Sequence, residues 1–385
     1  MGENDNGYDA SQIKVLGVME GIRRRPGMYV GSTSERGLHQ LVYEAVGRAV
    51  NEVLAGRAGS VDVTLMPDGG IRVSDDGDSD AHGLEALLTR LPAGVAPGHR
   101  RAAEISPLGV GLCVTNALSS RLTAEVRRAG VRWVQEYARG DALAPPAAAG
   151  PAAGSGTTIV FRPDADVFGA AQCSYAVLAE RFRELAFLNR GLDMSLTDGR
   201  ESDGPRSERF RFPGGAREFV AFLDAGAVAG VPADVIGFER EDPRMAGTVE
   251  VALRWRDSRD SRDSGEERVR SFANSRPTPG GGTHVAGFRV GVAAAVTAYA
   301  RDRRLLTAAD PDLGPDRIGE GLTAVVSAKL DRPEYLGATR GELGGAAVCA
   351  CVEQAVREHL GTWLEAHPER GDAIVARLVR DARRQ

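Results

Sequence analysis

An amphipathic helix that runs directly into a tight hairpin constrains the fold of this chain more than any other feature. In the segment 37–56, GLHQLVYEAVGRAVNEVLAG, apolar residues recur at helical spacing. Glu44 and Arg48 lie four residues apart on that helix and therefore share one face. Two strand patterns then flank the turn 67–70, and the second strand ends in Asp-Asp-Gly at 75–77. The chain thus places a carboxylate on a helix shortly before a strand that ends in two more carboxylates.

The composition is that of an ordinary globular protein. The 385 residues suffice for about two domains, and 42% are hydrophobic and 26% charged. No run of about 18 apolar residues occurs, and the polar N-terminus is unlike a signal peptide, so we expect a cytoplasmic protein without membrane contact. The net charge of −5 argues against unspecific nucleic-acid binding by the chain as a whole. Cys349 and Cys351 form a C-x-C without a second Cys/His pair at metal spacing, which favours free thiols and predicts no metal ligands.

Further motifs surround the hairpin in a fixed order. They are IKVLGVMEGIRRRPGMYVG before it, and GVGLCVTNAL, SGTTIVFRP, LAFLNRGL, GGTHVAGFR and GEGLTAVVSAKL after it. The ordered set resembles the GHKL (Bergerat-fold) ATPases, and in detail the ATPase half of the gyrase B and topoisomerase IV B subunits of type IIA DNA topoisomerases. The GGTHVAGFR stretch favours gyrase over the mismatch-repair and heat-shock ATPases, which share only the first domain.

The resemblance covers nearly the whole chain and implies an α+β architecture. We expect a flexible N-terminal arm at 1–12, a GHKL ATPase-like domain at 13–222 with a mixed sheet and helices on one face, and an α/β transducer domain at 223–385 similar to a domain of a ribosomal protein. In the family the arm covers the partner's nucleotide, and Tyr8 matches its tyrosine, although a disordered tail is an equal interpretation. The family's C-terminal metal-binding TOPRIM domain is expected to be absent.

Local patterns add three expectations. The segment 92–111 is rich in Gly, Pro and Ala, as a mobile lid would be. The low-complexity stretch 142–156, ALAPPAAAGPAAGSG, predicts a loop before the next strand. Asp372 is a candidate cap for a final helix.

The resemblance assigns catalysis to Glu44. This residue matches the general base that orients and deprotonates the attacking water, which requires a carboxylate within hydrogen-bond reach of that water. Without the flanking motifs, Glu44 would be interpreted as a solvated helix glutamate.

Three residues match the part of the site that holds the base. Asp75 matches the aspartate that accepts a hydrogen bond from the adenine amino group, and Gly77 matches the glycine that lets backbone and base approach closely. Thr157 matches the threonine that supports this aspartate. Taken alone, Asp75 and Gly77 would more simply close a hairpin as an Asx turn.

The phosphate contacts are expected from two segments. Gly109, Val110 and Gly111 stand where the family has its phosphate loop, and a helix start offers free backbone N–H groups to an anion. Arg340 matches the transducer lysine that reaches the terminal phosphate, with a planar fork in place of a point cation.

One departure from the family pattern dominates the functional prediction. Where the family has Asp-Asn, with the asparagine binding Mg²⁺, this chain has Gly47-Arg48. A guanidinium has no lone pair for a metal, so the Mg²⁺ ligand is lost. Arg48 is predicted either to pair with Glu44, one turn away, or to supply positive charge to the phosphates. Further departures lie in the triphosphate contacts, at 78–81, 95–96, 106–108 and 338–340.

These observations predict a gyrase B-like ATP-operated clamp with weak or lost ATP hydrolysis. The cofactors implied by the family are ATP and Mg²⁺, and the implied partners are a second B-type subunit, in a homodimer or mixed dimer, and a breakage–reunion A subunit. DNA would be bound only through the assembled complex. The alternatives are a degenerate paralogue that regulates a genuine gyrase and a self-protection factor against a gyrase inhibitor.

Overall fold

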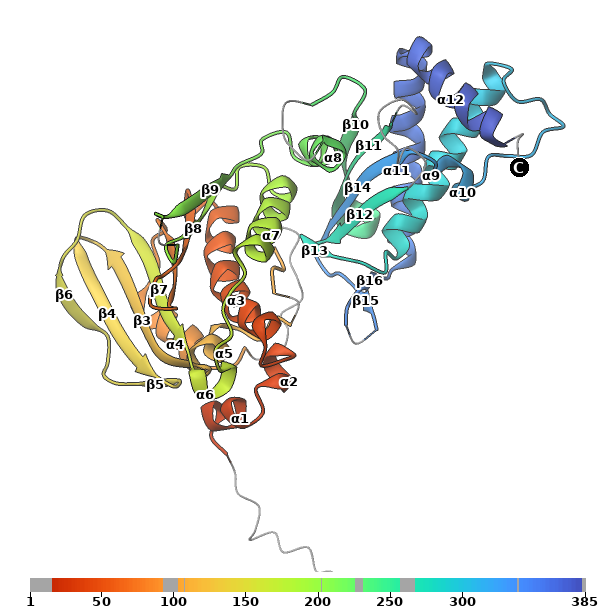
Figure 1. Cartoon of the computed structure of the whole chain (residues 1–385). Coiled ribbons are helices and arrows are strands. Elements are labelled where there is room, and N and C mark those ends of the chain that lie inside the picture. The colour runs from red at the N-terminus through yellow and green to blue at the C-terminus, as the bar shows by residue number, and fades with distance from the viewer. Residues whose placement is uncertain are drawn as a thin grey trace, which may run out of the picture.

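The chain forms two units joined in sequence order, each built from a sheet and the helices that cover it (Figure 1). The computed structural model describes residues 16–92, 103–106, 108–201, 203–225, 231–256, 267–337 and 339–382. The first unit contains a nine-stranded sheet in the order β5-β4-β3-β7-β2-β1-β8-β9, with β6 beside β4. Its strands are β1 Val61–Leu65, β2 Ile71–Asp75, β3 Ser119–Arg128, β4 Val131–Ala138, β5 Asp141–Ala142, β6 Ala147–Pro151, β7 Gly156–Pro163, β8 Met194–Asp198 and β9 Arg206–Phe210. The pair β1–β8 is parallel and its neighbours are antiparallel, so the predicted mixed sheet is confirmed.

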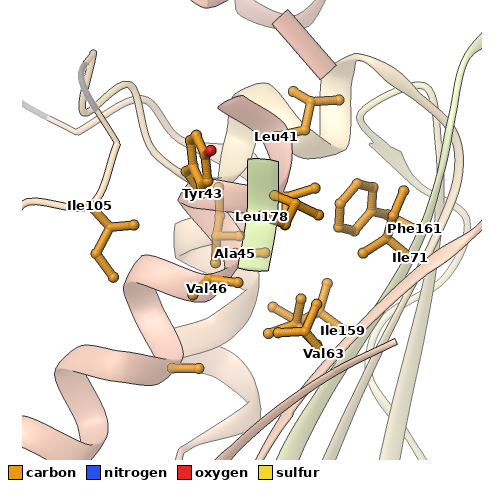
Figure 2. Close-up of a cluster of buried hydrophobic side chains, with 14 of the residues drawn as sticks. Leu41, Tyr43, Ala45, Val46, Val63, Ile71, Ile105, Ile159, Phe161 and Leu178 are labelled. Atoms are coloured by element: carbon orange, nitrogen blue, oxygen red, sulfur yellow. The ribbon is translucent and has the colours of Figure 1, made fainter. Parts of the chain in front are cut away.

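Helices cover one face of this sheet. They are α1 Val18–Arg24, α2 Gly27–Val30, α3 Glu35–Leu54, α4 Ala81–Thr89, α5 Leu112–Ala117, α6 Ala165–Phe168 and α7 Tyr175–Leu188. The apolar stripe of α3 lies against the sheet, and Leu41 and Val46 of the helix belong to one buried cluster with Val63 and Ile159 of the strands (Figure 2). Burying this stripe drives the packing of α3, because each fully buried aliphatic side chain contributes roughly 1.5–3 kcal/mol. The polar face of α3 is thereby left at the rim of the layer.

The second unit is a five-stranded sheet covered on both faces. Its order is β10-β11-β14-β12-β13, formed by β10 Ile236–Asp242, β11 Gly247–Trp255, β12 Arg268–Ala273, β13 Arg276–Pro277 and β14 Leu322–Leu330. The main helices are α8 Ala216–Ala225, α9 Thr283–Asp302, α10 Pro315–Ile318, α11 Ala346–Ala366 and α12 Pro368–Ala382, with a 3₁₀ turn at Pro243–Met245 and a small hairpin of β15 Tyr335–Leu336 and β16 Glu342–Leu343. Helix α8 packs on β11 and β14, so the boundary predicted after residue 222 lies inside a helix of the second unit.

The two units are tied together at the end of α7. The Phe187 ring stacks on Phe212 and Phe219, with centroids 3.9 and 4.7 Å away, in a cluster shared with the second sheet. Beside it, Lys329 Nζ donates to Asn189 Oδ1 at 3.1 Å across the boundary. Burial lowers the pKa of Lys329. The contact is therefore both apolar and hydrogen-bonded, which favours a fixed rather than a hinged junction.

Two local predictions are wrong. The stretch 142–156 is not only loop, because β6 inside it pairs with β4 through Val134 and Ala147. An edge strand without large apolar side chains leaves no alternation for a sequence pattern to detect. Asp372 lies inside α12 rather than at its start, and its carboxylate accepts a hydrogen bond from Tyr299 Oη at 2.8 Å. Among the described helices, none has the length and apolar character needed to cross a membrane.

Candidate nucleotide site

The site lies where the polar face of α3 meets the ends of β2 and β7. Asp75 closes β2 and stands directly opposite Thr157 in the antiparallel β2–β7 ladder, so the two side chains lie on the same sheet face. Glu44 and Arg48 occupy successive turns of α3. The start of α5 follows Gly111 and completes the rim. The predicted residues of both the base and the phosphate contacts are thus brought to one edge.

Glu44 binds the predicted phosphate loop directly. Its two carboxylate oxygens accept hydrogen bonds from the backbone N–H groups of Val110, at 2.9 Å, and Gly111, at 3.0 Å. Gly109 and Gly111 have φ of 59° and 86°, the left-handed region that turns successive N–H groups inward. Burial raises the pKa of Glu44, and hydrogen bonds from Ser106 and the two amides oppose this rise. A raised pKa suits a general base. Each of the two amides has a single hydrogen and already donates it to Glu44, so that hydrogen is not available to a phosphate.

Arg48 turns away from Glu44 and toward the predicted adenine contacts at the ends of β2 and β7. Its guanidinium donates to Asp75 Oδ2, to Ser79 Oγ, and to Thr157 Oγ1 at 2.9 Å. The Arg48 side chain is 11% exposed and that of Asp75 is 1% exposed. Neither predicted role of Arg48, an ion pair with Glu44 or charge at the phosphate loop, is what the structure records. The reason is geometric, because the Glu44 oxygens are held by amides while Asp75 offers a buried charge within reach.

Asp75 is held on its other side by the turn that follows it. The Gly77 N–H donates to Asp75 Oδ1 at 3.0 Å, which is the Asx-type contact expected from the sequence. A Cβ at Gly77 would lie 2.9 Å from that oxygen and 3.1 Å from the Arg57 carbonyl oxygen, so only glycine fits without movement. Burial raises the pKa of Asp75, and the Arg48 guanidinium opposes this effect.

The roles predicted for Arg340 and Tyr8 stay predictions. Arg340 has electrostatic neighbours in Arg276 and Tyr335, within the second unit. Tyr8 lies outside the described residues, as does most of the predicted lid. The site brings together the residues predicted to act as the general base, to contact adenine and to form the phosphate loop. The contribution of the second unit remains a prediction.

A short segment inside the predicted lid, at 103–106, connects α3 to the second unit, and the sequence did not predict this connection. Asn51, two turns after Glu44, exchanges hydrogen bonds with the backbone of Ala103 at 2.8 and 3.3 Å. The next residue, Glu104, donates its N–H to the Asn274 carbonyl at 2.8 Å and accepts from Tyr335 Oη at 3.2 Å. The spacing of Glu44, Arg48 and Asn51 on one helix face is the signal that would have suggested the first of these contacts.

The residues present do not fit a resident Mg²⁺ at the position where the family pattern requires one. Arg48 carries only donors, and its fork is satisfied by Asp75, Ser79 and Thr157. Within the described parts of the chain, no group of three or more His, Cys, Asp or Glu is arranged to hold a metal ion.

The element order and the sheet topology define the class as a GHKL ATPase-type domain followed by a transducer domain. The structure resembles the 43K ATPase domain of Thermus thermophilus gyrase B, with a TM-score of 0.77, 30% identity and 94% coverage of both chains. It also resembles the gyrase B protein of Myxococcus xanthus, with a TM-score of 0.78, 26% identity and coverage of 94% of this chain and 99% of that one. The chain belongs to the DNA gyrase B family.

Sequence comparison agrees with this assignment. The family model for DNA gyrase B matches residues 215–385. The gyrase B protein of Streptomyces coelicolor is 40% identical over 99% of this chain, and the novobiocin-sensitive and novobiocin-resistant gyrase B proteins of Streptomyces niveus are 37% and 38% identical over 99% and 97%. The chain spans about 58% of the length of these curated relatives.

Proposed function

We propose that this chain is a gyrase B-like clamp protein in which ATP hydrolysis is weak or lost. The observation that carries the proposal is the position of Arg48, whose guanidinium is bound to Asp75 and Thr157. In the family pattern, the residue at this helix position binds Mg²⁺. The residues that match Asp75 and Thr157 form the contact with adenine. One substitution therefore acts on both the metal and the base.

The expected loss of rate is large. Neutralisation of phosphate charge by Mg²⁺ is a major electrostatic contribution to phosphoryl transfer. Its removal without an equal replacement costs several kcal/mol of transition-state stabilisation, on the order of a thousandfold or more in rate. The cation that replaces the ligand does not compensate, because Arg48 points at Asp75 rather than at the amides of Val110 and Gly111.

The hydrogen bonds between the two units support the retention of a binding role. The segment that includes Glu104 bonds the α3 side of the site to Asn274 and Tyr335 of the second unit. We infer a cytoplasmic protein that pairs with a second copy of itself or with a genuine gyrase B protein, and that reaches a gyrase A protein and DNA only within such a complex. Arg340, which lies in the second unit near Arg276 and Tyr335, would supply the contact with the terminal phosphate that the family pattern assigns to this position.

The second candidate is a regulatory or self-protective paralogue of a genuine gyrase. It is favoured by the distribution of changes, because the core and the contacts between units are intact while Arg48 alters the site. Similarity to the novobiocin-sensitive and novobiocin-resistant relatives is nearly equal and does not choose between regulation and drug protection. Copurification with an active gyrase B would indicate regulation, and a change in that enzyme's drug sensitivity would indicate protection.

The decisive experiment is steady-state phosphate release from ATP and Mg²⁺. We expect a rate at least about a thousandfold below that of an active gyrase B ATPase fragment, and no further loss in Glu44→Ala. A rate within about tenfold of the active fragment that Glu44→Ala abolishes would refute the proposal. Arg57→Ala, which removes an exposed ion pair with Glu52, is the control for nonspecific effects of losing an arginine.

A further inference from the structure

We propose that Arg48 is an internal occupant of the base pocket, so that Asp75, Ser79 and Thr157 form a guanidinium site that the chain fills itself. Adenine enters only after Arg48 is displaced. The inference deepens the proposed function, since it rests on Asp75 being the residue that faces the base in the family. It is nevertheless independent of hydrolysis, because it concerns binding of the base alone.

The three acceptors match one guanidinium. Nη1 of Arg48 donates to Asp75 Oδ2, while Nη2 donates to Ser79 Oγ and to Thr157 Oγ1. The acceptors come from β2, from the loop after it and from β7, and together they offer a carboxylate and two hydroxyls to one planar fork. With 1% of the Asp75 side chain and 11% of the Arg48 side chain exposed, these are desolvated, charge-assisted hydrogen bonds.

The acceptors are held in place by contacts that do not involve Arg48. Gly77 donates to the other oxygen of Asp75 at 3.0 Å. The loop that carries Ser79 has contacts on both sides of it, because Arg128 pairs with Asp78 at 3.1 Å and the Asp80 carboxylate accepts the N–H of Gly83 at 2.9 Å. The pocket is therefore built to receive a cation, and we expect it to persist when the arginine side chain is shortened.

The opposite end of the site is also filled from within. Glu44 takes the two amide hydrogens of Val110 and Gly111 that would otherwise face a phosphate. A nucleotide must therefore displace an internal cation at one end and an internal anion at the other. Adenosine, which lacks phosphates, tests the Arg48 end alone.

We expect Arg48 to weaken adenosine binding strongly, because the hydrogen bonds of Arg48 that adenosine must replace are stronger than those it can form. A neutral amino group would replace three hydrogen bonds of a buried cation, each bond to a charged group being among the strongest in a protein. We expect Arg48→Ala to bind adenosine at least about a hundredfold more tightly than the unaltered protein.

The experiment uses titration calorimetry with adenosine on the full chain, on Arg48→Ala and Arg48→Asn, and on Arg57→Ala as the matched control. Arg57 follows the same helix and pairs with Glu52 on the surface. We expect binding by both Arg48 variants and none by the other two proteins up to millimolar ligand. Low millimolar guanidinium chloride should raise the melting temperature of Arg48→Ala selectively and compete with adenosine for it.

Several results would overturn the inference. Adenosine binding by the unaltered protein within about threefold of Arg48→Ala is one, and a folded Arg48→Ala that responds to neither adenosine nor guanidinium is another. If neither variant folds, the guanidinium N–H groups of the unaltered protein decide by NMR, because a filled pocket slows their hydrogen exchange at Arg48 relative to Arg57. Equal exchange refutes the proposal. None of these readouts depends on phosphate release. ATP turnover by the protein would therefore refute the proposed function without refuting this inference.

Discussion

Breaking the buried pair of Arg48 and Asp75 from one side should destabilise the first unit strongly. In Arg48→Met, the Asp75 carboxyl, whose side chain is 1% exposed, loses its counter-charge. Removing one partner of a buried pair typically costs about 3–5 kcal/mol, because the remaining charge is left uncompensated. Asp75→Asn strands the cation instead. The double variant Arg48→Met/Asp75→Asn should cost about 2 kcal/mol less than the sum of the single changes, since neither charge is left alone.

Cysteine labelling can measure this effect unit by unit. Cys113 is fully buried in the first unit, and Cys351 is 2% exposed in the second. Burial raises the pKa of Cys113 to about 11, so the thiol reacts chiefly from opened molecules. A loss of about 3 kcal/mol predicts labelling of Cys113 faster by about a hundredfold or more, with Cys351 as the internal reference.

Two outcomes would refute the reasoning. One is a Cys113 labelling rate in Arg48→Met within about threefold of the unaltered protein, and the other is strict additivity in the double variant. Arg57→Met should leave the rate unchanged, because its ion pair with Glu52 is exposed to solvent.

Three further predictions concern pH, packing and the contact between units. Burial lowers the pKa of His284 to about 4, so between pH 6.5 and 4 the unfolded chain binds a proton that the folded chain does not. The free energy of unfolding of the second unit in urea should therefore fall by up to about 3 kcal/mol over this range, relative to His284→Gln. Parallel pH profiles of the two proteins would contradict this. Gly77→Ala should cost about 1–3 kcal/mol because its Cβ would lie 2.9 Å from Asp75 Oδ1, whereas Gly27→Ala, with no atom within 4 Å, should be nearly neutral in the same melt. Glu104→Ala should speed amide exchange at 103–106 by about tenfold through loss of the Tyr335 bond, and unchanged protection would show that this segment is held by other contacts.

The fold was largely predictable from the sequence because its signals are local. The apolar spacing in 37–56 predicted α3, and the turn at 67–70 predicted the β1–β2 hairpin. Such patterns report which face of an element must be buried, and burial is the dominant force in packing. The strand β6 escaped prediction because its alanines and glycine carry almost no such signal.

The neighbours of individual polar groups were much harder to predict. Helical spacing correctly placed Glu44 and Arg48 on one face, yet their one-turn separation did not make them partners. Whether Arg48 pairs with Glu44 or with Asp75 depends on which charge is already satisfied, and that depends on the backbone of Val110 and Gly111.

The sequence by itself determined the helix at 37–56, the hairpin after it and the presence of a cation at position 48, since these follow from residue type and local period. The expected layer architecture came from the resemblance of the ordered motifs to a family. Only the tertiary structure decided where the new cation goes. The β2–β7 register sets Asp75 beside Thr157, and the packing of α3 brings Arg48 over both. A buried charge binds the nearest unsatisfied opposite charge, and that distance is fixed by the packed chain rather than by separation along it.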